Sequence, residues 1–229
     1  MKTFIASGFI VTLLGILGPG QVVPIKDGPA VLRSPLDQRV RQFELNDAIL
    51  RDGVAELSSN RIEGLHLGIE EILRENINDD PRTQNPHFSL RLENKTVREI
   101  LDALCESDAR YVWSSDSLSI NVYPKASVGN ATYLPNHELE RISLNNITDP
   151  DQALTPLSKL MPNEQVGYMG FGDIQYERPW TVTFEHITVR RMINRLAEHL
   201  GPQSLWIWQG SRSERMFTFL KWGPASRSD

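Results

Sequence analysis

The sequence predicts an α+β protein of two tandem two-layer units, each in the order helix, strand, strand, helix, strand, strand. The first observation is a repeat, because residues 88–104 read FSLRLENKTVREILDAL and residues 180–196 read WTVTFEHITVRRMINRL. The second is that both segments pass from alternating apolar positions, typical of a half-buried strand, to an apolar stripe at helical spacing. The third is a pair of strand-like runs, separated by turn residues, after each helix. Two helices laid on one face of a small sheet would bury both stripes.

The helices of the repeat are expected to begin at threonine caps, with the second at an offset of 188 − 96 = 92 residues. Thr96 and Glu99 form the pattern of a capping box, in which each side chain bonds the other residue's backbone N–H. Arg191 replaces the glutamate in the second copy, so we expect the cap of Thr188 without its reciprocal bond. The predicted apolar faces are Val97, Ile100, Leu101, Leu104 and Cys105 in the first copy and Val189, Met192, Ile193, Leu196 and Ala197 in the second.

An earlier helix is predicted in each unit. Asn46 is the expected N-cap of the first, and Asp149 that of the second, with Pro150 at the first helical position and Gln152 closing a box. Pro156 should shorten or bend the second helix. The apolar faces are Leu50, Val54 and Leu57 in one helix and Leu154, Leu157 and Met161 in the other. Residues 76–85 are expected to be a surface loop inserted in the first unit.

Aromatic residues of the closing hairpins give the candidate binding face. If Val112 and Ile207 point at the helices, their neighbours line an open sheet face that could bind peptide, glycan or protein. The alternative is that the two open faces pack on each other or on the linker. The edge strands offer a second route, by main-chain pairing with a partner strand. The candidate residues are Tyr111, Trp113, Trp206 and Trp208.

The rest of the chain is divided by composition. Residues 1–20 have the layout of a secretory signal, with an uncleaved membrane anchor as the alternative, and the proline-rich residues 21–42 are expected to be a linker. The first unit is placed at 43–124, a linker at 125–143, the second unit at 144–222 and a disordered tail at 223–229. Cys105 is the only cysteine, so the fold has no intrachain disulfide, and we expect a buried, inert thiol.

Several function classes are disfavoured. A formal net charge of -5 argues against a nucleic-acid binder. We found no catalytic, nucleotide-binding or zinc-binding motif, and we therefore expect no enzyme activity, metal or cofactor. Glu185 and His186 are interpreted as a solvated strand end, and the adjacent Glu70 and Glu71 as unsuited to paired acid–base work.

The first unit resembles the short N-terminal (STN) domain shared by secretins and TonB-dependent transducers. The resemblance rests on Ala48 near an early helix start, Gly68-Ile69-Glu70, residues 88–104, Tyr111-Val112-Trp113 and the strand at 119–124, and covers residues 43–124. Residues 144–222 resemble a degenerate copy. The resemblance implies a periplasmic adaptor module, here expected as a free-standing pair without a barrel.

Two functional hypotheses follow. The first is an exported, non-catalytic adaptor, periplasmic or secreted in a bacterium, that binds an envelope protein such as a regulator, a transporter or a secretion component. Contact with the membrane is expected only through an uncleaved signal, and the oligomeric state is left open. The alternative is a glycan or cell-wall binding module that uses the sheet-face aromatic residues.

Overall fold

The computed structural model describes residues 34–60, 62–76, 78–116, 119–159, 165–170, 176–201, 204–211 and 214–221, the stretch 165–170 by its backbone alone. The expected signal peptide, most of the expected linker at 21–42 and the expected tail lie outside the described residues. The fold is mixed α+β, which confirms the predicted class.

The chain forms its elements in the following order. The strands are β1 (Arg39–Ala48), β2 (His66–Glu70), β3 (Phe88–Thr96), β4 (Tyr111–Asp116), β5 (Ser119–Pro124), β6 (Glu138–Ile147), β7 (Gln165–Gly170), β8 (Trp180–Thr188), β9 (Ser204–Gly210) and β10 (Glu214–Lys221). The helices are α1 (Leu50–Ser59), α2 (Pro81–Gln84), α3 (Val97–Ser107), α4 (Pro150–Ser158) and α5 (Val189–His199), with 3-10 turns η1 (Pro35–Asp37), η2 (Lys125–Ser127) and η3 (Leu134–Asn136).

One six-stranded sheet runs through both halves of the chain, in the order β4-β5-β2-β9-β10-β7. Its first three strands come from the first half and its last three from the second, and β2 pairs with β9 in parallel where they meet. Two smaller antiparallel sheets, β1-β3 and β6-β8, complete the fold. The prediction of a separate small sheet in each unit is therefore wrong, because the two sheets join at β2 and β9.

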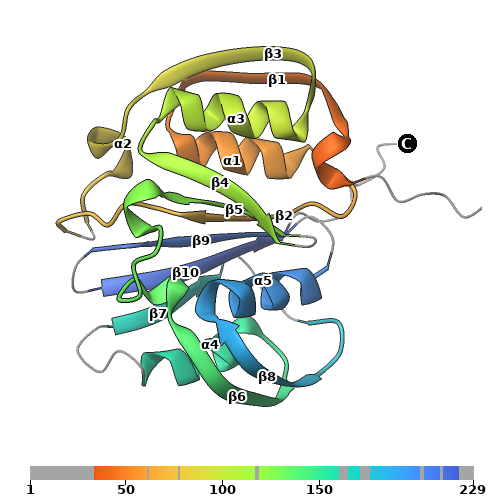
Figure 1. The fold of residues 1–229 in the computed structure, drawn as a ribbon, viewed down its shortest axis with the longest axis vertical. Coiled ribbons are helices and arrows are strands. Elements are labelled where there is room, and N and C mark those ends of the chain that lie inside the picture. The colour runs from red at the N-terminus through yellow and green to blue at the C-terminus, as the bar shows by residue number, and fades with distance from the viewer. Residues whose placement is uncertain are drawn as a thin grey trace, which may run out of the picture. The chain divides into compact units, whose positions relative to one another are not determined.

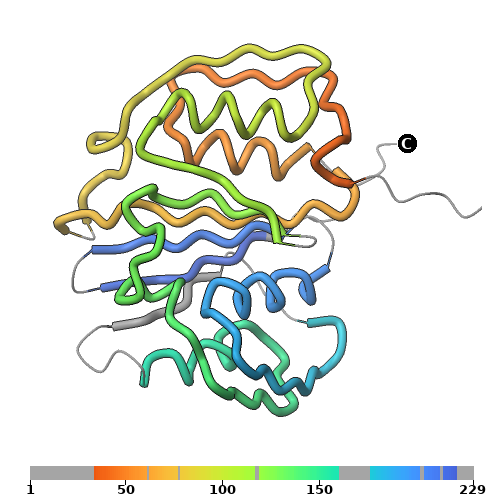
Figure 2. The backbone as a smooth tube through the Cα atoms, in the orientation of Figure 1, coloured from red at the N-terminus to blue at the C-terminus, as the bar shows by residue number. Residues whose placement is uncertain are grey.

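Each pair of long helices lies between a two-stranded sheet and the central sheet (Figure 1). Helices α1 and α3 contact β1 and β3 on one side and β2 and β4 on the other, while α4 and α5 contact β6 and β8 as well as β7 and β9. The tube in Figure 2 follows the same arrangement from red to blue. The predicted two-layer unit is corrected to three layers.

The missing layer comes from two strands that the sequence prediction assigned elsewhere. Residues 21–42 were expected to be a linker and residues 125–143 another, yet β1 begins at Arg39 and β6 at Glu138. Asn46 lies inside β1 and does not cap α1, whose cap position is Ile49. Both strands bear a bulge that breaks their register with β3 or β8, at Leu45/Ala48 and Leu144/Ile147. A bulge interrupts strict alternation, which hid the strands.

The other helix starts follow the prediction, except that Gln152 accepts from the Thr148 N–H at 3.0 Å and does not close a box on Asp149. The Thr96 hydroxyl accepts from the Glu99 N–H at 3.2 Å, and the Glu99 carboxylate accepts from the Thr96 N–H at 2.8 Å. Thr188 caps α5 by accepting from the Arg191 N–H at 3.3 Å. Asp149 caps α4 through the Gln152 N–H at 3.0 Å. Helix α4 ends at Ser158, soon after Pro156, and the predicted apolar residue Met161 lies outside the described residues.

Two hydrophobic clusters form the core. The first is built around α1 and α3, with Val97 fully buried, and the second around α4 and α5, with Val189 fully buried. Strand β9 belongs to both, because Leu205 and Ile207 join the first cluster whereas Trp206 and Trp208 join the second. Successive residues of a strand point to opposite faces. The two helix pairs therefore cover opposite faces of the central sheet.

Candidate functional site

The predicted aromatic face is not an open face. Trp206 and Trp208 are 1% and 0% exposed, and Tyr111 is 3% exposed. Trp113 is half-buried against the first cluster. Of the four candidate residues, the structure brings only Tyr111 and Trp113 together beside a cavity. Two of the four aromatic residues named in the glycan hypothesis, Trp206 and Trp208, are therefore not exposed.

The orientation error has a physical cause. Tyr111, and not Val112, packs into the first cluster, so the residues expected to face solvent face the helices. In β9 both faces are covered, by α1 and α3 through Ile207 and by α4 and α5 through Trp206 and Trp208. Alternation shows that neighbouring side chains diverge but does not show which face is covered.

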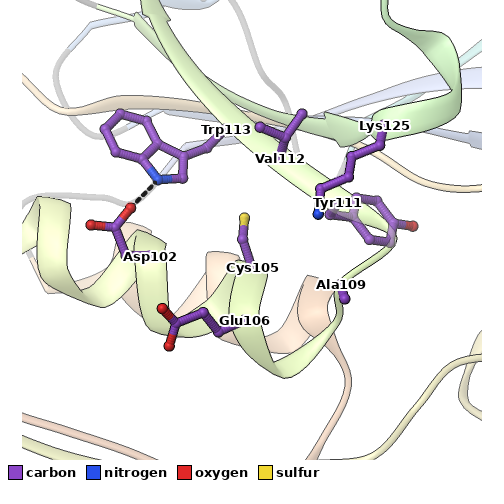
Figure 3. A pocket seen from close by; sticks show the side chains of 8 residues that line it. All are labelled: Asp102, Cys105, Glu106, Ala109, Tyr111, Val112, Trp113 and Lys125. Atoms are coloured by element: carbon purple, nitrogen blue, oxygen red, sulfur yellow. Dashed lines mark hydrogen bonds between the residues drawn. The ribbon is translucent and has the colours of Figure 1, made fainter.

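A surface cavity beside β4, which we name the β4 groove, is the leading candidate site. Its volume is about 680 Å³. Figure 3 shows α3 as one wall and β4 as the other, with the Cys105 sulfur between them. Its lining residues are Asp102, Cys105, Glu106, Ala109, Tyr111, Val112, Trp113 and Lys125.

The position of Trp113 in this groove is set by two contacts. Its indole N–H donates to the Asp102 carboxylate at 2.8 Å, drawn as a dashed line in Figure 3. The Arg98 guanidinium carbon lies 5.7 Å from the centre of its ring, within the range of a cation–π interaction. These two contacts fix the orientation of the Trp113 ring beside the groove.

The backbone of β4 is open along its outer edge. Strand β4 ends the central sheet, and among the described strands none pairs with its outer side. The Lys125 N–H donates to the Arg110 carbonyl at 2.8 Å at the start of the β4–β5 ladder. Antiparallel alternation then points the N–H and C=O groups of residues 112, 114 and 116 at β5, and those of Trp113 and Ser115 outward. The edge offers hydrogen-bond donors and acceptors in the spacing of a strand.

The chemistry of the groove does not favour nucleophilic catalysis. Burial raises the pKa of the Cys105 thiol to about 12, and the nearby Asp102 carboxylate adds to the shift. A thiol is a nucleophile as its thiolate, which is scarce at neutral pH when the pKa is this high. We therefore expect an unreactive thiol, as the sequence suggested, although Cys105 is half-buried and not fully buried. Asp102 and Glu106 give the α3 wall a negative charge, and Lys125 lies at the other end.

A second cavity adjoins the groove at Ala109 and Lys125 and has a volume of about 590 Å³. Apolar side chains dominate its lining, among them Ile72 and Leu73 after β2. The Tyr111 hydroxyl accepts from the Ile72 N–H at 2.9 Å, and this bond ties the strand end to β4. Sequence reasoning did not find this cavity, because its lining comes from loops with no periodic pattern.

A polar cluster at the meeting of β2 and α5 was also missed. Glu70 is fully buried and Glu71 nearly so, whereas the sequence indicated only that this adjacent pair is unsuited to paired acid–base work. Arg190 bonds both carboxylate oxygens of Glu70, and its guanidinium carbon lies 4.5 Å from the centre of the Tyr123 ring. Glu185 and His186, by contrast, are exposed as predicted.

Within the described ranges, no group of three or more His, Cys, Asp or Glu side chains could hold a metal ion. In the same part of the chain no helix is long and apolar enough to cross a membrane. Comparison with known proteins gave no match among protein-family models, curated proteins or solved structures. The function is therefore argued from the site alone.

Proposed function

We propose that the chain is an exported, non-catalytic adaptor that binds a protein partner in the bacterial envelope, and that the partner adds a strand to β4. The observation that carries the proposal is the open backbone edge at Trp113 and Ser115 beside the β4 groove. An exposed edge of this kind accepts an extended segment by main-chain pairing, and flanking pockets give specificity.

The chemistry of the groove defines the expected segment. A strand added to β4 would place side chains against α3, where Asp102 and Glu106 carry negative charge. Basic residues on the partner would therefore be favoured on that side. Val112 and Trp113 offer an apolar surface to the apolar side chains of the partner segment. The expected partner segment is an extended strand with apolar side chains, and basic side chains beside α3 would strengthen its binding.

We also propose that the chain is a tandem pair of STN-like units, spanning β1 to β5 and β6 to β10. The strand orders β4-β5-β2 and β9-β10-β7 support this, as do the buried Val97 and Val189. Strands β3 and β8 share one burial pattern, and positive φ angles recur at matched places. These are Asp47 (49°) and Asn146 (52°) at the bulges, and Asn94 (52°) and His186 (49°) before the capped helices. The resemblance to STN domains supports the adaptor role and the envelope location.

Capture from an envelope extract tests the proposal with two matched substitutions. Ser115→Pro removes one outward N–H from β4, whereas Ser115→Ala keeps it and alters the same exposed side chain. We expect the captured protein to be lost with the proline variant and kept with the alanine variant. Hydrogen exchange should show that the bound partner protects the amides of Trp113 and Ser115. Equal capture by both variants, without this protection, would rule out strand addition at β4.

The charge of the groove gives an independent test. Glu106→Lys reverses a charge on the α3 wall, and Glu56→Lys makes the same change on the exposed face of α1. Only the first is expected to weaken capture, and its effect should shrink at high salt, because surface charge interactions are screened.

A further inference from the structure

Strand β9 corresponds in its half of the sheet to β4, and the edge of β9 that corresponds to the outer edge of β4 is paired with β2. The two strands pair in parallel, with Gly68 opposite Trp206 and Glu70 opposite Trp208. The Glu71 N–H donates to the Trp208 carbonyl at 2.7 Å, and the Arg74 N–H to the Gly210 carbonyl at 2.9 Å. Both strands are covered on both faces by helices of the two halves.

The two edges joined there have counterparts at the open ends of the sheet. Each half of the chain contributes three adjacent strands to the sheet, β4-β5-β2 from the first half and β9-β10-β7 from the second. The junction joins the third strand of the first set, β2, to the first strand of the second set, β9. Among the described strands, the two end strands of the sheet are β4, a first strand, and β7, a third strand. The outer edge of β4 thus corresponds to the edge of β9 that pairs with β2, and the outer edge of β7 corresponds to the edge of β2 that pairs with β9.

The ladders fix which residues correspond. Gly68 lies opposite Asn121, which lies opposite Ser114, whereas Gly167 lies opposite Met216, which lies opposite Gln209. Gly167 in β7 therefore takes the place of Gly68 in β2, and Tyr111 takes the place of Trp206. A glycine is needed at the junction because a Cβ atom on Gly68 would lie 2.3 Å from the Trp206 ring. The sequence of β7 keeps glycine at this position.

The outward backbone groups also correspond. Because the Glu71 N–H points at β9, alternation points the N–H of Ile69 the same way. Tyr168 takes the place of Ile69 in β7, so its N–H is directed at the outer edge. On β4 the outward groups belong to Trp113 and Ser115, which take the places of Trp208 and Gly210. Trp208 and Gly210 are the residues whose carbonyls accept hydrogen bonds from the chain that follows β2.

We propose that a second copy of this chain supplies the strand that pairs with β4, and that this strand is β7 in parallel, with Gly167 opposite Tyr111. The inference rests on the proposed function, since it names the partner of the same edge. The two edges differ, so the contact is heterologous and leaves a free β4 edge and a free β7 edge at the ends of any open assembly. Copies can therefore add in a line, and a different envelope protein can still bind the last free β4 edge.

Sedimentation velocity of the purified protein over a concentration series tests the inference with two complementary variants. Ser115→Pro blocks the β4 edge, and Tyr168→Pro blocks the β7 edge. Ser115→Ala and Tyr168→Ala are the matched controls that keep the backbone N–H. We expect the unchanged protein and both alanine variants to form a ladder of species that grows with concentration, and each proline variant to lose every species above the monomer.

Mixing the two proline variants decides between a blocked edge and a misfolded chain. Each keeps one usable edge, so the mixture should form a one-to-one dimer and nothing larger. A protein that stays monomeric at every concentration would overturn the inference, as would association that persists in both proline variants or a mixture that stays monomeric. A monomeric protein that still captures an envelope partner through β4 would leave the proposed function standing.

Discussion

Arg190 in the first turn of α5 donates two hydrogen bonds to the carboxylate of Glu70 at the end of β2. The bond from Nη2 to Oε2 is 2.8 Å long. The pair joins residues from opposite halves of the chain, and the Glu70 side chain is fully buried. Burial raises the pKa of Glu70, while the hydrogen bonds and charge of Arg190 oppose that rise. The contact therefore holds the two helix-covered halves together and depends on both partners.

Arg190→Ala should destabilise the protein by about 3–5 kcal/mol, because it leaves a buried carboxylate without its opposite charge. Equilibrium urea unfolding measures this loss. Arg191→Ala is the control, since Arg191 lies one residue away and its ion pair with Asp116, at 2.7 Å, is exposed. That variant should lose about 1 kcal/mol or less. Equal losses for the two variants would contradict the role assigned to Arg190.

The capping box of α3 should make stability depend on pH in the acid range. A hydrogen bond from Lys95 and others from Thr96 lower the pKa of Glu99 from its ordinary value of 4.5 to about 2. A carboxyl with a lowered folded pKa stabilises the fold above its unfolded pKa, and this contribution is lost as the pH falls from 4.5 towards 2. Glu99→Gln should flatten the stability profile in that window, measured by urea unfolding at each pH. Glu93→Gln, an exposed substitution in β3, should leave the profile steeper than Glu99→Gln does.

Gly68→Ala should cost about 1–3 kcal/mol, as expected for overpacking in a core. The new methyl would lie 2.3 Å from the Trp206 ring, which cannot turn aside easily because its N–H donates to Asn194 at 2.8 Å. Gly53→Ala is the comparison, because its methyl would meet the flexible side-chain ends of Leu104, at 2.5 Å, and Leu45, at 3.1 Å, and alanine favours the helix. Thermal unfolding should rank Gly68→Ala as clearly the less stable variant. The reverse ranking would show that β2 and β9 are not in the close contact described.

Cys105 should react slowly with thiol reagents in the folded protein. Half-burial limits the access of a reagent to Cys105. Its pKa of about 12 leaves little thiolate at neutral pH. Labelling should become fast in denaturant, and the ratio of the two rates measures the protection. A native rate equal to the denatured rate would contradict the burial of this thiol.

The sequence predicted the helices better than the strands. The caps at Thr96, Asp149 and Thr188 have local chemical signatures, and the structure has helices starting at each. Strands β1 and β6 were missed because bulges at Asp47 and Asn146 break their alternation, and because their partners β3 and β8 lie far along the chain. Local patterns carry no information on pairing at that separation.

The candidate site was predicted only in part. Tyr111 and Trp113 do lie beside a cavity, but Trp206 and Trp208 are in the core. The error arose because the sequence cannot show that β2 and β9 join the two halves into one sheet with helices on opposite faces. The burial of Glu70 has the same origin, since its partner Arg190 is contributed by the other half.

The sharing of β9 between both clusters also bears on how the protein is made. The core around α1 and α3 includes Leu205 and Ile207, which the ribosome adds only after it has added α5. The amino-terminal half therefore leaves the ribosome with an unfilled place in its interior, although domains often fold in order as they emerge. We therefore expect neither core to be complete until translation has passed β9.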